Sequence, residues 1–246
     1  MAGIIRTGNR LTGASILRRG GRMPTFNRGE GRQGDPDFAS VSLLLAMDGT
    51  NGSTTFTDSS SNALTITPAG NAQISTAQGK FGSQSAYFDG TGDYLDVPGS
   101  ALFSFPGDFT VECWVRLDTA NNATDQTIIE LGTYLDGILI RGCASTADSV
   151  YVNGTNLGSL NTFFSSATWG FVQVKRSGTA VTVSVDGTSR LTGTVSGTVN
   201  STNAASRIGA LRSFSGQAMA GYVEDLRVTK GVARPSTVPA AAFPTL

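Results

Sequence analysis

The chain has 246 residues and a mass of 25.4 kDa, which is enough for one large β domain or two small ones with a substantial core. Basic and acidic residues number 18 each and histidine is absent, which excludes histidine-based triads, histidine acid–base catalysis and histidine-ligated metal sites. Lys and Glu together supply only seven residues while Gly supplies 31, so we expect few solvent-facing helices.

The first 40 residues differ in charge from the rest of the chain. They carry seven arginines against three acidic residues, a net charge of +4, whereas the remaining 206 residues carry 11 basic and 15 acidic groups, a net charge of −4. Residues 1–38 are Gly-rich and show no sustained period of 2 or 3.6. We therefore expect an extended arm that becomes ordered only when another surface binds it.

The arm is predicted to bind a protein partner rather than nucleic acid. Arginine suits carboxylates as well as phosphates, but only Phe26 interleaves with the arginines and no nucleic-acid-binding motif is present. The two apolar pairs of the arm would fill pockets on the partner. The predicted anchoring residues are Ile4, Ile5, Arg6, Arg10, Ile16, Leu17, Arg18, Arg19, Arg22, Phe26 and Arg28.

Neither a secretory signal nor a membrane-spanning helix is predicted. The apolar stretches of the arm stop after Ile5 and after Leu17, well short of the about 7–15 residues of a signal. The longest apolar run elsewhere, residues 43–47, is far below the roughly 20 residues that span a bilayer. We expect a soluble protein made in the cytoplasm, without a membrane partner.

From Val41 onward, short alternating or β-branched runs are separated by clusters of Gly, Asn, Asp and Ser. These runs recur every 8–15 residues or so without helical patterns between them, which predicts an all-β, antiparallel two-sheet jelly-roll sandwich. The predicted strands cover residues 41–47, 64–67, 85–89, 94–97, 109–117, 127–131, 137–143, 149–152, 169–175, 180–185, 189–194, 206–211 and 218–228.

Two strand regions carry the clearest local patterns. Valine alternates with polar residues over 181–185, and the following Asp186-Gly187 suits a type I′ hairpin turn. In the run 109–117, Trp114 is expected to join the apolar side chains of that strand in the core. Cys113 and Cys143 are expected to be buried thiols rather than a disulfide.

The predicted organisation is an arm over residues 1–40 followed by one sandwich over 41–246. The sandwich includes an extended C-terminal tail from about residue 231, which is rich in Pro and Ala. We expect this tail to lie back on the domain.

Five ordered segments resemble the laminin-G-like, concanavalin A-type lectin/glucanase superfamily. They are LLLAMDGTNGSTTFTDSS (43–60), GKFGSQSAYFDGTGDYLDVPGS (79–100), FTVECWVRL (109–117), WGFVQVKRSGTAVTVSVDGTSR (169–190) and RIGALRSFSGQAMAGYVEDLRVTKGVAR (207–234). The branch they resemble most is common in bacteriophage virion proteins and bacterial surface proteins. The resemblance implies a jelly roll of about a dozen strands with a concave face that can bind carbohydrate. Because the superfamily also contains glycosidases, adhesins and structural modules, the fold alone does not decide the function.

Glycoside hydrolysis needs two carboxyl groups about 5–5.5 Å or 6.5–9.5 Å apart. Hydrolases of this fold carry acidic residues at alternating positions of one strand, and no such run occurs here. Glu224 and Asp225 are adjacent and are expected to point to opposite faces, and Asp93 and Asp96 lie in a loop and at a strand start. We therefore expect no enzymatic activity.

Calcium is a second candidate ligand, because domains of this type can bind it at a rim. Oxygen ligands are available at Asp48, Asp58, Asp89 and Asp93, all in Gly- or Ser-rich turns. Tight turns require the same residue types without any metal, and the EF-hand spacing is absent. The sequence therefore predicts no cofactor.

A carbohydrate site would combine an aromatic platform with polar side chains that bind hydroxyl groups. The candidates at loops expected to edge the concave sheet are Tyr134, Asp136, Tyr151 and Asn153, with Trp169 as a further platform. Phe214, Arg141 and Asn156 are additional candidates. Each aromatic residue could instead serve packing alone.

The sequence favours a non-enzymatic phage virion protein of the capsid-decorating or head-fibre type. Its arm would anchor it to a major capsid protein or another virion protein, and its sandwich would be displayed outside as a homo-oligomer that holds surface glycans. The alternatives are a tail-associated carbohydrate-binding adhesin and, behind it, a glycan hydrolase.

Overall fold

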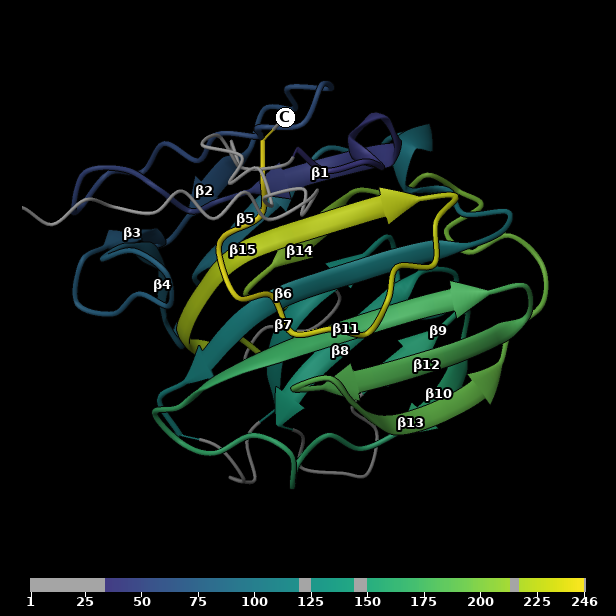
Figure 1. Ribbon diagram of the computed structural model, residues 1–246. Helices are drawn as coiled ribbons and strands as arrows, with labels where there is room; N and C mark the ends of the chain where they lie inside the picture. The colour runs from purple at the N-terminus through teal and green to yellow at the C-terminus, as the bar shows by residue number, and fades with distance from the viewer. Residues whose placement is uncertain (1–33, 120–124, 144–149, 213–216, 246) are drawn as a thin grey trace, which may run out of the picture. The chain divides into compact units, whose positions relative to one another are not determined.

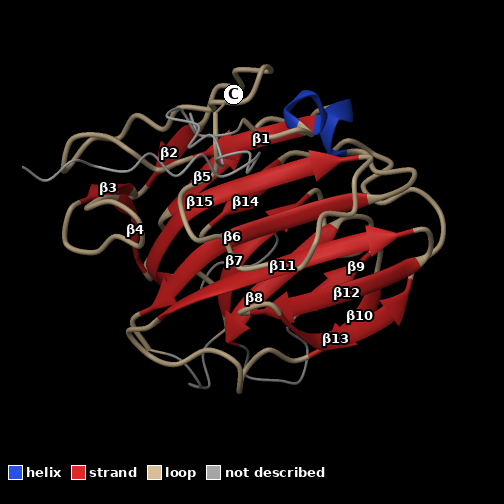
Figure 2. Cartoon of the chain, in the orientation of Figure 1, coloured by secondary structure: helices blue, strands red, loops and turns tan. Residues whose placement is uncertain are grey.

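The computed structural model describes residues 34–119, 125–143, 150–212 and 217–245. The anchoring residues predicted in the arm, from Ile4 to Arg28, lie outside these ranges. Within them strands dominate, and the helical structure consists of two single 3-10 turns, η1 (Phe38–Ser40) and η2 (Ala101–Phe103) (Figure 2). The all-β class is confirmed. None of the helical segments described has the length and hydropathy of a membrane span.

The strands form two antiparallel sheets that pack as a sandwich (Figure 1). The larger sheet has the order β13 (Thr188–Thr194), β12 (Ala180–Val185), β11 (Trp169–Ser177), β6 (Phe109–Leu117), β15 (Ala220–Lys230), β4 (Ser85–Asp89) and β3 (Gln73–Ser75), with β1 (Val41–Leu45) paired to the second half of β15. The smaller sheet has the order β10 (Thr155–Gly158), β9 (Val150–Val152), β8 (Ile138–Cys143), β7 (Gln126–Leu131), β14 (Ser206–Ile208), β5 (Tyr94–Val97) and β2 (Thr67–Ala69).

Each predicted strand overlaps an observed one, but two short strands were not predicted. These are β3 and β10, which lie at the edges of the two sheets and carry mainly polar residues. An edge strand needs no alternating apolar pattern, since it packs little side-chain surface into the core. The strand predicted at 64–67 begins only at Thr67, so its boundary was wrong by three residues.

The core fills the space between the sheets, and strand alternation accounts for it. In β12, the alternating Val181, Val183 and Val185 share one face of the strand, and all three are buried in the core. The turn that follows has φ of 50° at Asp186 and 73° at Gly187, the two positive values that a type I′ hairpin requires. Cys113 is a buried free thiol of the same core, whereas the side chain of Cys143 lies outside the described atoms.

A second apolar cluster lies on the outer face of the larger sheet. The strand β6 sends alternate residues inward, so Trp114 points outward; the expectation that it is a core residue is confirmed, but in this second cluster rather than in the one between the sheets. Trp114 is nevertheless only 3% exposed, because other apolar side chains cover it. The cluster consists of Val41, Leu44, Trp114, Phe171 and Phe243, with Phe38, Phe81 and Trp169 packed against it.

The C-terminal segment, residues 231–245, supplies part of this cover by crossing the outer face of β15, β6 and β11 (Figure 1). The Thr110 hydroxyl donates to the Val232 carbonyl at 2.9 Å and accepts from the Arg234 amide at 2.9 Å. The Gln173 side chain donates to the Pro235 carbonyl at 3.0 Å. Each of these bonds joins the segment to an outward-facing side chain of the sheet, so the segment is an integral layer of the domain.

Beneath the segment, two arginines and two carboxylates form a buried network. Arg227 donates to Glu112 Oε1 at 2.6 and 2.8 Å and to Asp35 Oδ2 at 2.9 Å, and Arg234 forms a two-pronged pair with Asp35 at 2.8 and 2.9 Å. Burial alone would raise the pKa of Asp35, but Arg234 and Arg227 lower it overall. The network joins the start of the described chain, the middle of the sheet and the C-terminal segment.

A β-bulge in β15 places two acidic side chains on this same outer face. The register against β6 shifts between Glu224 and Arg227, and Asp225 has a left-handed φ of 49°. Glu224 accepts from the amides of Lys80 and Phe81, while Asp225 accepts from the Phe243 amide at 2.9 Å. The expectation that these neighbours point to opposite faces was therefore wrong, because the bulge interrupts strand alternation.

The bulge makes the stability of the fold dependent on pH. Burial raises the pKa of Asp225 from 3.8 to about 7, and the neighbouring Glu224 and Asp48 add to the rise. Between these two pKa values the folded state binds more protons than the unfolded state, so the contribution of Asp225 to stability falls as pH rises and levels off above about 7.

We expect Asp225→Asn to remove this dependence. The thermal midpoint of the variant should match that of the wild type near pH 4, exceed it progressively up to pH 7, and keep a constant advantage above that. Thermal unfolding followed by circular dichroism at each pH measures the difference, with Asp118→Asn, at an exposed carboxyl, as the control. A variant less stable than the wild type at pH 8 would contradict this explanation.

Candidate binding surface

The structure brings four of the five predicted carbohydrate-binding residues to one end of the smaller sheet. The Tyr134 and Tyr151 rings meet edge to face with centroids 5.7 Å apart. Tyr151 points outward because Val150 and Val152 on either side of it are buried. Asn153 is the first residue of the turn between β9 and β10, and its backbone amide donates to the Gly137 carbonyl at 2.7 Å. Asp136 lies in the same loop as Tyr134.

The polar members of this group serve the local backbone. Asp136 accepts four hydrogen bonds, from the amides and hydroxyls of Ser201 and Thr202 at 2.7–3.2 Å. Burial would raise the pKa of Asp136, but these bonds lower it overall. The Asn153 side chain donates to the Ser196 carbonyl at 3.1 Å. The part of the group that remains suited to a ligand is therefore the tyrosine pair.

Trp169 is not part of this group. It opens β11 in the larger sheet and packs, half-buried, against the apolar cluster beneath the C-terminal segment. Tyr151 and Trp169 thus lie on opposite outer faces of the sandwich. Of the additional candidates, Asn156 lies opposite Tyr151 in the register of β9 and β10, and Phe214 lies outside the described residues.

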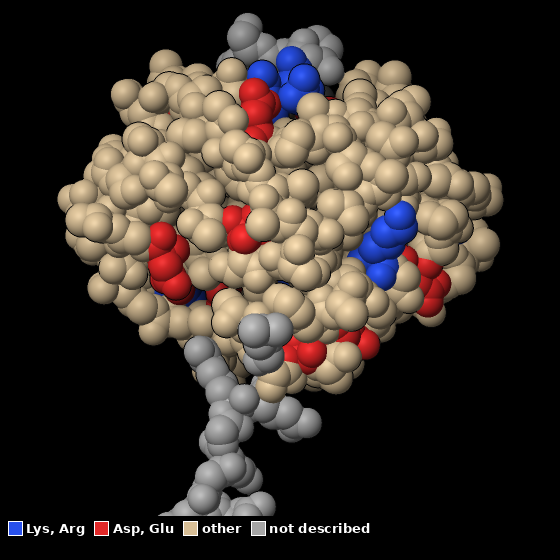
Figure 3. All heavy atoms as spheres, turned by 90° about the horizontal axis from the view of Figure 1, so that it is seen from above, with Lys and Arg blue, Asp and Glu red and all other residues tan. Residues whose placement is uncertain are grey.

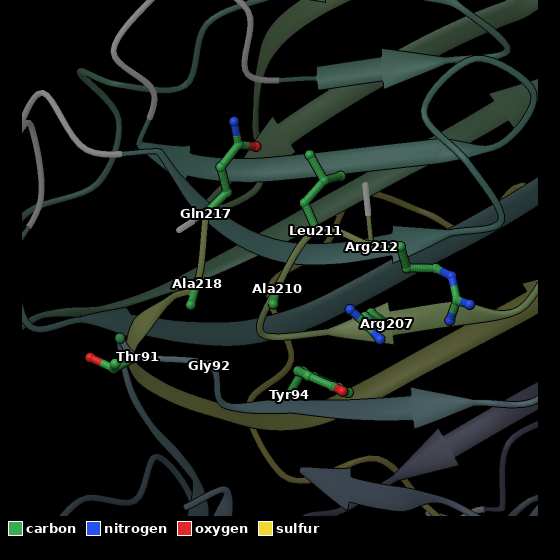
Figure 4. Close-up of a pocket in the computed structure, with 10 residues that line it drawn as sticks. Thr91, Gly92, Tyr94, Arg207, Ala210, Leu211, Arg212, Gln217 and Ala218 are labelled. Carbon is green, nitrogen blue, oxygen red and sulfur yellow. The ribbon is translucent and has the colours of Figure 1, made fainter. Parts of the chain in front are cut away.

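A pocket of about 420 Å³ opens on the outer face of the smaller sheet (Figure 4). Its wall combines one aromatic ring, two guanidinium groups, an amide and small apolar side chains. The lining residues are Gly90, Thr91, Gly92, Tyr94, Arg207, Ala210, Leu211, Arg212, Gln217 and Ala218.

Sheet register assembles the charged side of the pocket. In β5, Leu95 and Val97 are buried, so Tyr94 and Asp96 share the outer face. Asp96 lies opposite Arg207 of β14, which places the Arg207 guanidinium 3.8 Å from the centroid of the Tyr94 ring. Asp96 Oδ1 accepts from Arg207 Nε at 2.9 Å and from Arg212 Nη1 at 3.2 Å. One carboxylate thus holds two arginines at the pocket.

Glu130 connects the pocket with the tyrosine pair. It lies opposite Arg207 in β7, and it accepts from the Arg212 amide at 2.8 Å and the Tyr134 amide at 3.2 Å. Its side chain is fully buried, and burial raises its pKa despite these two hydrogen bonds. The pocket and the tyrosine pair are therefore neighbouring parts of one face, fixed by the same carboxyl group.

Sequence reasoning missed the pocket because its residues come from distant segments. Arg207 and Arg212 follow no recognisable spacing relative to Tyr94, and only the antiparallel pairing of β5 with β14 brings them together. The alternation in Tyr94–Val97 was the available signal, because it places Tyr94 and Asp96 on the exposed face of a predicted strand.

The carboxyl groups considered for catalysis are engaged elsewhere. Glu224 and Asp225 accept backbone amides beneath the C-terminal cover, as described above. Asp93 is fully buried and accepts from the Asp89 amide at 2.8 Å, whereas Asp96 holds the two arginines of the pocket.

The four aspartates considered for calcium lie in three separate places. Asp58 accepts from the amides of Leu44, Ser60 and Leu64, and so organises the loop after β1. Asp89 and Asp93 lie together in the turn between β4 and β5, whereas Asp48 lies near Glu224 and Asp225. Across the described ranges, no group of three or more His, Cys, Asp or Glu side chains is arranged to hold a metal ion.

The charges on the face of the sandwich seen from above are dispersed. Seen from above the sandwich, acidic and basic side chains are scattered singly or in small groups among uncharged residues (Figure 3). That face lacks the continuous basic stripe typical of a nucleic-acid-binding surface.

Comparison with solved structures relates the fold to binding domains. Domain 4 of AbnA, a GH43 extracellular arabinanase from Geobacillus stearothermophilus solved with arabinotriose, is 19% identical with a TM-score of 0.59, over 80% of this chain and 95% of that one. The binding domain of Paraclostridial Mosquitocidal Protein 1 is 13% identical with a TM-score of 0.62, over 81% of this chain and 51% of that one. The botulinum neurotoxin serotype D binding domain is 13% identical with a TM-score of 0.56, over 79% and 49%.

This chain spans about half the length of the two toxin binding domains. A search of curated protein sequences gave no match. The family described as Concanavalin A-like lectin/glucanases superfamily, of laminin G type, matches residues 89–238, which include the pocket and most strands of both sheets. Sequence and fold agree in this assignment, and the chain belongs to that superfamily.

Proposed function

We propose that this chain is a non-catalytic carbohydrate-binding domain whose binding site is the pocket formed by Tyr94, Arg207 and Arg212. The observation that carries the proposal is the combination, in one pocket of about 420 Å³, of an aromatic ring, charged hydrogen-bond donors and an apolar wall. Sugars present apolar ring faces and hydroxyl groups, and pockets of this size and composition suit small ligands. The neighbouring Tyr134 and Tyr151 would contact further units of a longer glycan.

The relatives support the same function. Domain 4 of the arabinanase was solved with arabinotriose, and the toxin structures are binding domains. The absence of catalysis is part of the proposal. Glu224 and Asp225, the pair of carboxyls considered for glycoside hydrolysis, lie under the C-terminal segment and accept hydrogen bonds from backbone amides. Incubation with a polysaccharide that the protein binds should release no new reducing ends.

Tyr94→Ala should weaken glycan binding about tenfold while leaving the fold intact, because it removes the aromatic wall of the pocket. Tyr151→Ala should weaken binding of oligosaccharides but not of monosaccharides. Glycan-array screening of the wild type identifies the ligand, and calorimetry on the two variants measures the loss.

Tyr87→Ala is the matched control, since Tyr87 pairs with Tyr222 on the larger sheet, with ring centroids 5.0 Å apart. Thermal unfolding verifies that each variant is folded. Equal binding by Tyr94→Ala and the wild type would place the site elsewhere, and a loss in Tyr87→Ala alone would place it on the larger sheet.

We also propose that the sandwich is displayed on a bacteriophage particle, with the preceding arm as its anchor to a capsid or tail protein. The arm carries all seven arginines of the first 40 residues, and Asp35 ties its end to Arg227 and Arg234. A pulling force on the arm would therefore be transmitted to the larger sheet through the ion pairs of Asp35. A tail-associated adhesin is the alternative, distinguished by where the arm attaches.

Two truncations test this anchoring. Deletion of residues 1–33 should leave a sandwich with the wild-type thermal midpoint that no longer joins the particle. Deletion of 1–38 should also lower stability, by about 3–5 kcal/mol, because it removes Asp35 and leaves two buried arginines with one partner fewer. Particle incorporation of the 1–33 deletion at the wild-type level would refute the anchoring role.

A further inference from the structure

We infer that the pocket selects sugars that carry a carboxylate, such as uronic or sialic acids, over their neutral counterparts. This inference rests on the proposed carbohydrate-binding function and adds the class of sugar. It follows from the charges at the pocket.

The arginines of the pocket outnumber the carboxylate that holds them. Asp96 uses a single oxygen, Oδ1, to accept from both Arg207 and Arg212, so the two guanidinium groups share one hydrogen-bonded carboxylate, while the buried Glu130 also acts on both arginines electrostatically. Each guanidinium carries five N–H donors, and Asp96 engages only Nε of one arginine and Nη1 of the other. The side chain of Arg212 is 35% exposed, so it is accessible from the pocket.

The other acidic groups near the pocket already have hydrogen-bond or ion-pair partners. Glu130 is fully buried, and both of its oxygens accept backbone amides. Asp89 and Asp93 accept amides of their own turn and of the Asn71 region. Asp125 pairs with Arg141 at 3.6 Å. The pocket therefore favours an anion.

The remaining walls fit a sugar ring that bears such an anion. Figure 4 shows Tyr94, Arg207 and Arg212 on one side of the pocket and Gln217 on the other. The Gln217 oxygen already accepts from Arg141 at 2.9 Å, which leaves the amide nitrogen of Gln217 as the donor for a hydroxyl group. Ala210, Leu211 and Ala218 supply the apolar surface between them. A planar carboxylate is the partner that a guanidinium fork binds with two parallel hydrogen bonds.

The test uses pairs of probes that differ only in charge. Calorimetry compares oligogalacturonate with its methyl ester, and sialyllactose with lactose, at low and at high salt. The acidic member of at least one pair should bind about tenfold more tightly than its neutral counterpart, and the difference should shrink as salt rises.

Arg212→Gln should abolish this preference without a matching loss for neutral sugars. Arg190→Gln is the control and should retain the preference. Arg190 is an exposed arginine of β13, in the larger sheet, and stacks on Phe163. A thermal unfolding curve for each variant separates loss of the group from loss of the fold.

The outcomes separate the two claims. Equal affinity for the acidic and neutral members of both pairs, or an unchanged preference in Arg212→Gln, would overturn the selectivity while leaving carbohydrate binding intact. Absence of binding to every acidic and neutral glycan of an array would overturn both the selectivity and the proposed function.

Discussion

The buried ion network at Arg227 is the interaction on which the rest of the structure depends. It joins β15 to β6 through Glu112, the start of the sandwich through Asp35, and the C-terminal segment through the Asp35–Arg234 pair. Burying four charges is costly, and the cost is offset only because each has a hydrogen-bonded partner. The network thereby fixes the C-terminal segment over the larger sheet, where Phe243 covers Trp114 and Phe171.

Because the C-terminal segment covers one outer face of the sandwich, the two outer faces have different roles. The outer face of the larger sheet is covered by a structural layer. Its aromatic and acidic residues, which the sequence offers as candidates for a functional site, pack against one another or accept backbone hydrogen bonds. The smaller sheet carries the pocket, whose polar groups are held by Asp96 and Glu130 at fixed distances. This division of the two faces is compatible with the proposal that the domain presents a binding surface while its arm attaches it to an assembly.

The sequence was sufficient for the fold but only partly for the site. Strand alternation and the Asp186-Gly187 turn predicted the sandwich and the hairpin after β12, because both are local properties. The bulge at Asp225 and the burial of the outward-facing Trp114 could not be predicted, since each involves a segment distant in sequence that covers the sheet. The pairing of Tyr94 with Arg207 across β5 and β14 depends on register in the same way.

The central claim is that the ligand binds to the outer face of the smaller sheet. Backbone amide chemical-shift mapping by nuclear magnetic resonance during titration with a bound glycan tests it most directly. The account predicts perturbations at residues 90–96 and 207–212, with smaller ones near Tyr134 and Tyr151, and none over 169–176 or 231–243. Perturbations confined to the C-terminal segment and β11 would contradict it.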